Sequence, residues 1–461
     1  MIAQYVLTMA LAGLLFAAPA SAEKQQPPAG GPPKDFKLPA KKTFQLENGL
    51  GATLIPYGTL PKASVTILIR AGNFNEAPNE TWLADVTNSL IEEGTTTRNA
   101  EALASEFASM GGGLSVSAGL DQTSASSDAL AEFADEIVRL LADVVRHPAF
   151  PESEVARLQN DFVRNLSIQL SQPQPQADRR FAELLYPDHP YGRMFPSEEM
   201  IRGYSVEKVK AFYQSNFGAQ RAHVYVAGVF NEADVEKAIR EGFGDWEKGP
   251  EPAVNPPKMQ TKRVVHLIHR PEAPQSTLRI GLPVVDPSHK DYIALAVTNA
   301  LLGGSFGSRI TSNIREDKGY TYSPNSAVQV RYRAAHWVES ADVTTKDTAA
   351  AMREIFQEIQ RLQTEPPPAE ELQGIQNYLA GIFVLQNSSR QGVIDRLSFI
   401  RLHGLPETYL TDYVKNVYAV TPADVQRIAK EYLQDGKMTI VVVGDRSQVR
   451  SQLTAFGQLA E

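Results

Sequence analysis

The chain is 461 residues long, 43% of them hydrophobic, and carries a formal net charge of −8. This length and apolar content can bury a substantial core in two or more domains, so disorder is not expected. The acidic balance, with no basic run, excludes the electrostatic footprint of a nucleic-acid-binding or anionic-membrane-binding surface. Cysteine is absent, which excludes a disulfide scaffold, a lipoprotein, a thiol nucleophile and thiolate metal ligands.

The first 22 residues have the pattern of a cleavable signal peptide. An apolar run over residues 6–18 is followed by Ala20-Ser21-Ala22, so cleavage is predicted after Ala22, which indicates a periplasmic protein. The alternative, a retained membrane helix, needs a longer apolar span. We therefore expect no membrane span after cleavage. Residues 23–42 are rich in Pro, Gly and Lys and predict a flexible leader.

Beyond the leader, the hydrophobic spacing switches between the strand period and the helix period. The predicted elements, in chain order, are a hairpin over residues 44–56 that turns on Asn48-Gly49, a strand over 63–70, helices over 81–93 and 99–110, a strand pair over 114–118 and 122–126, and a long helix over 129–146. The triple glycine at residues 111–113 is expected to end the second helix.

This pattern returns about 217 residues later. Residues 137–140 correspond to 355–358, and the strand over 222–228 corresponds to 438–444. Matches that stay in register indicate a tandem duplication. We predict an α+β fold of two homologous domains, each a mostly antiparallel sheet covered by helices. The domains span residues 43–246 and 263–461, and the proline-rich residues 247–262 form the linker.

The most distinctive stretch is residues 301–326, LLGGSFGSRITSNIREDKGYTYSPNS. It contains a glycine pair, a short predicted helix that ends near Arg315, a turn at Lys318-Gly319, and a predicted strand with Tyr320 and Tyr322. This stretch resembles the second domain of the pitrilysin/insulinase family of zinc peptidases, which includes mitochondrial processing peptidase and bacterial two-chain relatives. The resemblance covers roughly residues 44–456 and implies a clamshell arrangement of two related domains.

In that family, an Arg at the helix end and a Tyr seven residues later help to hold the substrate beside the zinc. The matching residues are Arg315 and Tyr322, and the resemblance implies that they bind substrate and stabilise the oxyanion. Tyr320 is the competitor for the tyrosine's role, because alternate residues of a strand share one face. The alternative for both residues is a charged helix end and a packing tyrosine.

Active members of the family carry H-x-x-E-H on a first-domain helix, where two His hold zinc and the Glu activates a water. Here Asp85 and Ser89 stand at the histidine positions, and Asn88 stands at the glutamate position. The third ligand position falls near Arg164-Asn165, where neither residue is a carboxylate. The resemblance therefore implies a chain without zinc of its own.

Other catalytic centres are poorly supported. Asp85 and Glu92 lie near one helix face, but a hard cation prefers six or more oxygens, and Arg164 is expected to point at the same place. None of the eight histidines forms an i, i+4 pair, and His266 and His269 lie on a predicted strand where they face opposite ways. No G-x-S-x-G motif occurs, and the glycines at residues 303–307 lack the G-K-[ST] of a phosphate loop.

A lost metal motif beside a retained Arg/Tyr motif predicts the zinc-less subunit of a periplasmic heterodimeric zinc peptidase. A homologous partner with an intact H-x-x-E-H would hold the zinc, and the substrate would be a short or unfolded peptide. Residues 113–116, Gly113, Leu114, Ser115 and Val116, resemble the edge strand on which the family's catalytic subunits lay their substrate. The alternative is an inert clamshell protein that binds peptides or supports an assembly.

Overall fold

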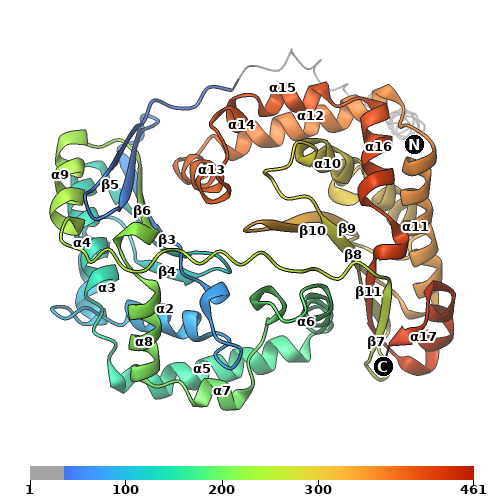
Figure 1. The fold of residues 1–461 in the computed structure, drawn as a ribbon, viewed down its shortest axis with the longest axis horizontal. Coiled ribbons are helices and arrows are strands. Elements are labelled where there is room, and N and C mark those ends of the chain that lie inside the picture. Colours follow the sequence, from blue (N-terminus) through green and yellow to red (C-terminus); the bar gives the residue numbers. More distant parts are fainter. Residues whose placement is uncertain (1–35, 461) are drawn as a thin grey trace, which may run out of the picture. The chain divides into compact units, whose positions relative to one another are not determined.

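The computed structural model describes residues 36–460, so the predicted signal peptide, its cleavage after Ala22 and most of the predicted leader lie outside the described residues. Two six-stranded mixed sheets organise the chain (Figure 1). Their strand orders correspond, β1-β2-β6-β3-β5-β4 in the first and β12-β7-β11-β8-β10-β9 in the second. The predicted α+β fold of two related domains is confirmed.

The first sheet contains β1 Lys42–Gln45, β2 Gly51–Pro56, β3 Lys62–Ile69, β4 Ser115–Ala118, β5 Thr123–Leu130 and β6 Ala222–Gly228. The second contains β7 Val264–His269, β8 Gln275–Val284, β9 Asn325–Arg331, β10 Ala334–Thr344, β11 Thr439–Gly444 and β12 Leu459–Ala460. Parallel pairing joins β2 to β6 and β7 to β11, and β12 is also parallel to β7. The other pairings in both sheets are antiparallel.

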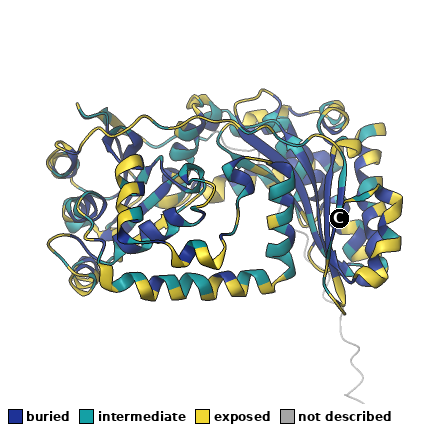
Figure 2. Cartoon of the chain, turned by 60° about the horizontal axis from the view of Figure 1, so that its bottom comes forward, coloured by how far each residue is buried: buried dark blue, intermediate teal, exposed yellow. Residues whose placement is uncertain are grey.

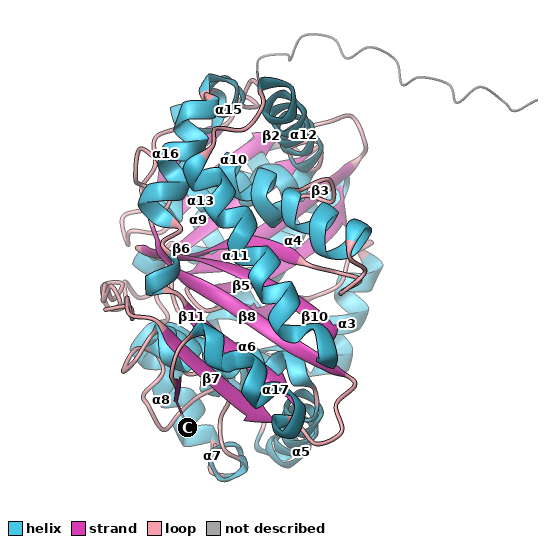
Figure 3. Ribbon diagram, turned by 90° about the vertical axis from the view of Figure 1, so that its right-hand side faces the viewer, coloured by secondary structure: helices cyan, strands magenta, loops and turns pink. Residues whose placement is uncertain are grey.

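Helices flank the strands of both sheets (Figure 3). Those of the first half are α2 Leu83–Glu92, α3 Ala100–Ser109, α4 Ala134–Arg146, α5 Glu152–Ser171, α6 Pro173–Leu185, α7 Glu198–Arg202, α8 Val206–Asn216 and α9 Glu232–Phe243. Those of the second half are α10 Tyr292–Asn299, α11 Thr348–Thr364, α12 Ala369–Gln386, α13 Arg390–His403, α14 Thr408–Thr411, α15 Tyr413–Ala419, α16 Pro422–Tyr432 and α17 Arg446–Leu453. Within residues 36–460, no helix is long and apolar enough to cross a membrane.

Local sequence explains several of these boundaries. The predicted hairpin forms between β1 and β2, and Gly49 adopts a φ of 93° that glycine reaches without Cβ strain. Asn48 anchors this turn by donating to the carbonyl oxygens of Phe243 at 2.7 Å and Trp246 at 2.9 Å. The predicted helix over residues 129–146 begins only at Ala134, because β5 continues to Leu130 and pairs there with β3.

The duplication is visible in the element boundaries. The helices α5 and α12 begin at residues 152 and 369, α6 and α13 at 173 and 390, and the strands β6 and β11 at 222 and 439, a constant separation of 217. Between the halves, residues 247–262 form neither helix nor strand. This segment is nevertheless attached, since Arg221 donates to the carbonyl oxygens of Pro250 and Glu251.

The two halves exchange one helix each. The first-half helix α6 packs on β8 and β11 of the second sheet, where Phe181 belongs to one apolar cluster with Val338 and Val441. The second-half helix α13 packs on β3 and β6 of the first sheet, where Leu397 joins a cluster with Ile55. The strands between these layers are largely buried, whereas the outer helix faces are exposed (Figure 2).

The last residues of the predicted leader also contact the second half. The ring of Phe36 meets that of Phe383 edge to face, with the centroids 4.9 Å apart. Lys41 forms an ion pair of 2.8 Å with Glu407. The segment before β1 therefore lies along the helices of the second half.

Candidate functional site

The distinctive stretch over residues 301–326 folds into two π-helical segments and a loop. Residues Ala300–Gly304 continue α10 as a π-helix, and Thr311–Asp317 form a second one. Such wide turns are rare and occur frequently at functional sites. Close packing requires glycine at position 303, because a Cβ there would lie 2.5 Å from Ser326 Oγ and 2.9 Å from Glu339 Oε2. The turn therefore packs directly against β9 and β10.

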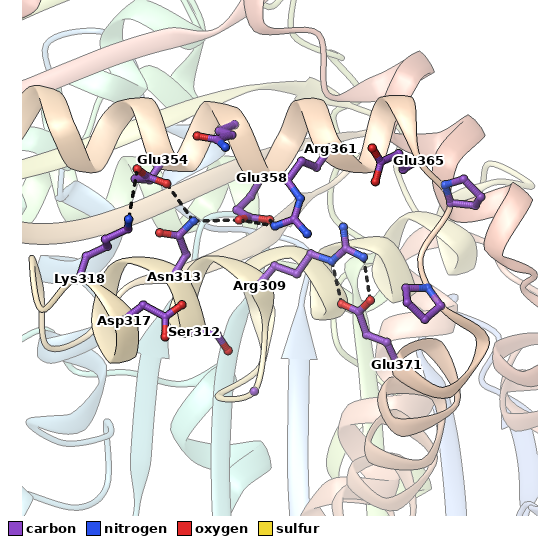
Figure 4. A pocket seen from close by; sticks show the side chains of 14 residues that line it. Arg309, Ser312, Asn313, Asp317, Lys318, Glu354, Glu358, Arg361, Glu365 and Glu371 are labelled. Atoms are coloured by element: carbon purple, nitrogen blue, oxygen red, sulfur yellow. Dashed lines mark hydrogen bonds and ion pairs between the residues drawn. The ribbon is translucent and has the colours of Figure 1, made fainter.

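Polar and charged side chains on the second π-helix and just before it bond to α11 and α12 (Figure 4). Arg309 donates two bonds of 2.7 Å to the carboxylate of Glu371, and this bond raises the pKa of Arg309. Asn313 donates to Glu354 at 3.0 Å and to Glu358 at 2.8 Å. Bidentate Arg–carboxylate pairs have a defined geometry, so the segment that carries Arg315 is fixed from two sides.

The structure brings Arg315 and Tyr322 together. The Arg315 guanidinium carbon lies 4.8 Å from the Tyr322 ring centroid and 4.6 Å from the Phe306 ring centroid. Both rings are exposed, Tyr322 at 78% and Phe306 at 71%. Within residues 36–460, Arg315 forms one ion pair, with its neighbour Glu316 at 3.0 Å. The result is a cation between two exposed aromatic rings.

Phe306 was missed by the sequence reasoning. The sequence feature that could have indicated it is a phenylalanine within GGSFGSR. The glycines on either side offer few neighbouring side chains for this ring to pack against. A ring face within 6 Å of a guanidinium attracts the cation. Phe306 and Tyr322 therefore orient Arg315 from two directions.

The prediction that Tyr320 and Tyr322 share one strand face is wrong. The strand β9 begins only at Asn325, and between it and Gly319 the chain makes just one isolated bridge, from Thr321 to Val343. Pro324 precedes β9 and has no N–H to offer a strand ladder. Tyr320 packs against the apolar core of the second half, whereas Tyr322 points into solvent beside Arg315. Tyr322 is thus the available hydroxyl.

In the first half, two of the three positions of the missing zinc motif, Asp85 and Asn88, form local side-chain hydrogen bonds. Asp85 accepts a bond of 2.7 Å from Asn73, and burial raises its pKa to about 6. Asn88 is buried and donates to Thr123 Oγ1 at 3.0 Å. Ser89 is half-buried on the same helix. Only the carboxylate of Asp85 is a usual zinc ligand, and the amide of Asn88 and the hydroxyl of Ser89 do not supply the remaining His, Cys or carboxylate donors that zinc requires.

Glu76 is a second buried acid beside Asp85, and the sequence reasoning did not find it. It accepts from the Ala84 N–H at 2.9 Å and from Asn73 at 3.0 Å, so it binds the first turn of α2. Burial is the main cause that raises the pKa of Glu76 to about 8, and the nearby Asp85 adds to it. This acid is therefore protonated at neutral pH.

Arg164 does not join this cluster as expected. Its side chain is 71% exposed and pairs at 2.8 Å with Asp161 of the same helix. Within residues 36–460, no three His, Asp or Glu side chains are grouped so that they could hold a metal ion.

The candidate peptide-binding residues lie at a sheet edge. The strand β4 is outermost in the first sheet, and a Cβ added to Gly113 just before it would meet no other atom within 4 Å among the described residues. The Val116 N–H donates at 2.6 Å to Glu92, which was considered only as a metal ligand. Because Glu92 occupies this donor, a peptide strand added along β4 would have to displace it. Ser115 is exposed, and Leu114 packs in part against the core.

The paired sheets and the vacated zinc motif define a two-domain peptidase-like protein without the family's zinc ligands. The insulinase (peptidase family M16) model matches residues 55–194, and the peptidase M16 inactive domain model matches residues 204–379. The chain belongs to this pitrilysin/insulinase family.

Individual relatives span nearly the whole chain. An uncharacterized zinc protease of Bacillus subtilis, YmxG, is 22% identical over 404 residues, which are 87% of this chain and 98% of the relative. The crystal structure of a protease from Helicobacter pylori is similar with a TM-score of 0.81 and 20% identity, over 88% of this chain and all of that one. A peptidase M16 inactive domain from Pseudomonas fluorescens has a TM-score of 0.80 and 23% identity, over 88% of this chain and 98% of that one.

Proposed function

We propose that this protein is the zinc-less subunit of a periplasmic heterodimeric zinc metallopeptidase. A homologous chain with an intact H-x-x-E-H would hold the zinc, and this chain would supply Arg315 and Tyr322 to the shared site. The substrate would be a short or unfolded peptide. Support comes from the family membership, from the unsuitable donor set at Asp85, Asn88 and Ser89, and from the Arg315 cluster.

The observation that carries the proposal is the exposure of the cluster of Phe306, Arg315 and Tyr322. Two aromatic rings that are 71% and 78% exposed are costly to leave in water unless another molecule covers them. The guanidinium and the Tyr322 hydroxyl are both hydrogen-bond donors. Together they suit a group that becomes negative, such as the carbonyl oxygen of a peptide during hydrolysis.

The contribution of each residue follows from this role. When water attacks the peptide carbon, charge develops on the oxygen, and a donor aimed at that oxygen is typically worth about 3–4 kcal/mol. The π-helix that carries Arg315 is held by Arg309 and Asn313 through carboxylates of α11 and α12. Arg315 is thus positioned before the substrate arrives, which lowers the ordering cost.

The decisive experiment mixes the chain with its zinc-binding homologue and measures cleavage of an unstructured peptide. We expect Arg315→Ala to lower kcat/KM by roughly a hundred- to a thousandfold while the complex stays intact. Arg353→Ala, an exposed arginine on α11 in the same half, is the matched control and should leave cleavage unchanged. Unchanged turnover of Arg315→Ala in a confirmed complex would contradict the catalytic role.

The two tyrosines provide a second comparison in the same assay. Tyr322→Phe keeps the ring beside Arg315 but removes the hydroxyl, so we expect a loss of at least tenfold. Tyr320→Phe changes a ring packed on the core and should retain full activity. Equal effects of the two substitutions would show that the hydroxyl of Tyr322 has no special part.

A second candidate function is an inert peptide-binding clamshell protein. It is favoured by the edge position of β4 and the open space at Gly113, which need no metal to pair with a peptide once the peptide displaces Glu92 from the Val116 N–H. This function predicts saturable peptide binding by the lone chain with no cleavage in any complex. It also predicts that Arg315→Ala leaves peptide affinity unchanged.

A further inference from the structure

A basic pocket of about 220 Å³ lies between the first sheet and the end of α13. The residues on its wall come from distant parts of the sequence and, within the described part of the chain, include three arginines but no Asp or Glu. Its polar lining consists mainly of Arg70, Gln122, Gln220, Arg221, His223 and Arg401. The chain as a whole carries a net charge of −8, so a pocket wall with three arginines differs from the average of the molecule.

None of the three arginines has an ion pair among residues 36–460. Arg221 is buried and donates to main-chain oxygens, including that of Arg70 at 3.1 Å. The Arg70 guanidinium lies 4.3 Å from the ring centroid of Tyr332. Arg401 is exposed, and its guanidinium has no hydrogen-bond partner within the described part of the chain. Its five N–H donors are therefore available.

His223 adds a buried group without a partner. It is 4% exposed, and its Nε2 lies 2.8 Å from Thr53 Oγ1, but its Nδ1 has no hydrogen-bond partner within residues 36–460. The atoms His223 Nδ1 and Arg401 Nη2 meet at Gly51, where a Cβ would lie 2.3 Å from the first and 3.2 Å from the second. A buried polar atom without a partner is uncommon and destabilising.

The protonation states follow from these surroundings. Burial, with the charge of Arg401 as a second cause, lowers the pKa of His223 well below its ordinary value, so the imidazole is neutral. If Nε2 accepts from the Thr53 hydroxyl, Nδ1 carries the proton and becomes a donor toward the pocket. Burial and the neighbouring Arg70 also lower the pKa of Arg221. The pocket thus offers donors and a positive potential.

This arrangement is specific to one half of the molecule. Arg401 is the twelfth residue of α13, and the twelfth residue of the corresponding helix α6 is Leu184. Leu184 belongs to the apolar cluster between α6 and the second sheet. The exchanged helices therefore do not require a charged residue at this place for packing.

We propose that the basic pocket binds an oxyanion, a carboxylate or a phosphate group, with Arg401 as the principal donor and His223 Nδ1 and Arg70 beside it. The planar guanidinium suits both groups, since it can donate two parallel bonds. The small volume admits the anionic group rather than a large ligand. The site is independent of the proposed zinc-bearing partner.

The test is calorimetric titration of the purified chain at low ionic strength. One probe is inorganic phosphate. The other is a short peptide whose side chains carry no charge, and it is used in two forms, one with a free C-terminal carboxylate and one with an amidated C-terminus. We expect saturable binding of phosphate or of the free-acid peptide in a one-to-one ratio. Phosphate alone would identify a small inorganic anion, and a preference for the free acid would identify a peptide carboxylate.

Substitutions distinguish anion binding in the pocket from non-specific attraction to positive charge. Arg401→Gln, at an exposed position, should weaken binding at least tenfold, and Arg70→Gln should weaken it as well. Arg396→Gln is the control on the same helix, because Arg396 bonds Gln386 outside the pocket. The proposal is overturned by the absence of saturable binding of both probes. An equal loss in Arg401→Gln and Arg396→Gln would overturn it too.

Discussion

The two halves share one framework but place different chemistry on it. Each has six strands in a corresponding order, and each sends one helix onto the sheet of the other. In the first half, α2 meets the edge strand β4, and Glu92 bonds Val116 across that contact. In the second half, α10 continues as a π-helix against β9, where Gly303 fits between side chains. In the first half, the helix next to the edge strand is hydrogen-bonded to that strand. In the second half, the corresponding helix leads into the segment that carries the exposed cluster.

The difference in burial is equally instructive. The first half keeps the acids Glu76 and Asp85 away from water, where burial raises their pKa values. The second half presents Arg315 between two exposed rings. Matched regions of the two related halves therefore differ, with local hydrogen bonds in the first and an exposed cluster in the second. Substitutions in matched places can test this division.

The exchanged helices should show the largest effect. Phe181→Ala removes a ring that is 4% exposed on the second sheet, and we expect a loss of about 3–5 kcal/mol in the free energy of unfolding. Urea denaturation would be followed by the fluorescence of Trp337 in the second half and of Trp82 and Trp246 in the first. Because the halves exchange helices, all three signals should shift together.

Arg179→Ala, at an exposed position on the same helix, is the control and should change the stability by less than about 0.5 kcal/mol. Separate transitions for the two halves would contradict the coupling. They would show that α6 stabilises its sheet without linking the domains.

The buried acid of the first half should give a pH-dependent effect of intermediate size. The pKa of Glu76 is raised from 4.5 to about 8, so the folded state holds a proton that the unfolded state releases. Its contribution to stability is full below pH 4.5 and is lost as the pH rises toward 8. Relative to the wild type, Glu76→Gln should gain about 3 kcal/mol between pH 4.5 and pH 7, an upper figure that assumes the full shift.

The measurement is the free energy of unfolding at several pH values, with Glu101→Gln at an exposed position as the control. The glutamine oxygen can still accept from the Ala84 N–H and from Asn73. A difference between Glu76→Gln and wild type that does not vary with pH would mean that Glu76 is ionised in the folded protein.

The smallest effect concerns two equivalent helix caps. Thr421 accepts from the Asp424 N–H at 3.2 Å, and Asp424 accepts in return from the Thr421 N–H at 3.0 Å, which completes a capping box at α16. Ser205 caps α8 with a single bond of 3.5 Å. We expect Thr421→Ala to cost about 1 kcal/mol and Ser205→Ala a few tenths. Thermal unfolding would rank them, and the reverse order would show that bond length and reciprocity do not decide the strength of these caps.

The sequence by itself determined the features that depend on neighbours along the chain. The hairpin turn at Asn48-Gly49 and the helix stop at Gly111, which has a φ of 79°, follow from conformations that glycine adopts readily. The register of the duplication followed from repeated apolar spacing. The pairing of Arg315 with Tyr322 was expected from the family resemblance, and the short loop between them allows it.

Only the tertiary structure decided the features that join distant segments. Residue spacing alone did not reveal that α6 would cover the second sheet and α13 the first, or that Tyr320 would pack against the core while Tyr322 is exposed. The partners of Glu76 and the wall of the basic pocket come from elements far apart in the sequence. Burial, and with it the pKa of a buried group, depends on what surrounds a residue in space, and local spacing in the chain does not contain that information.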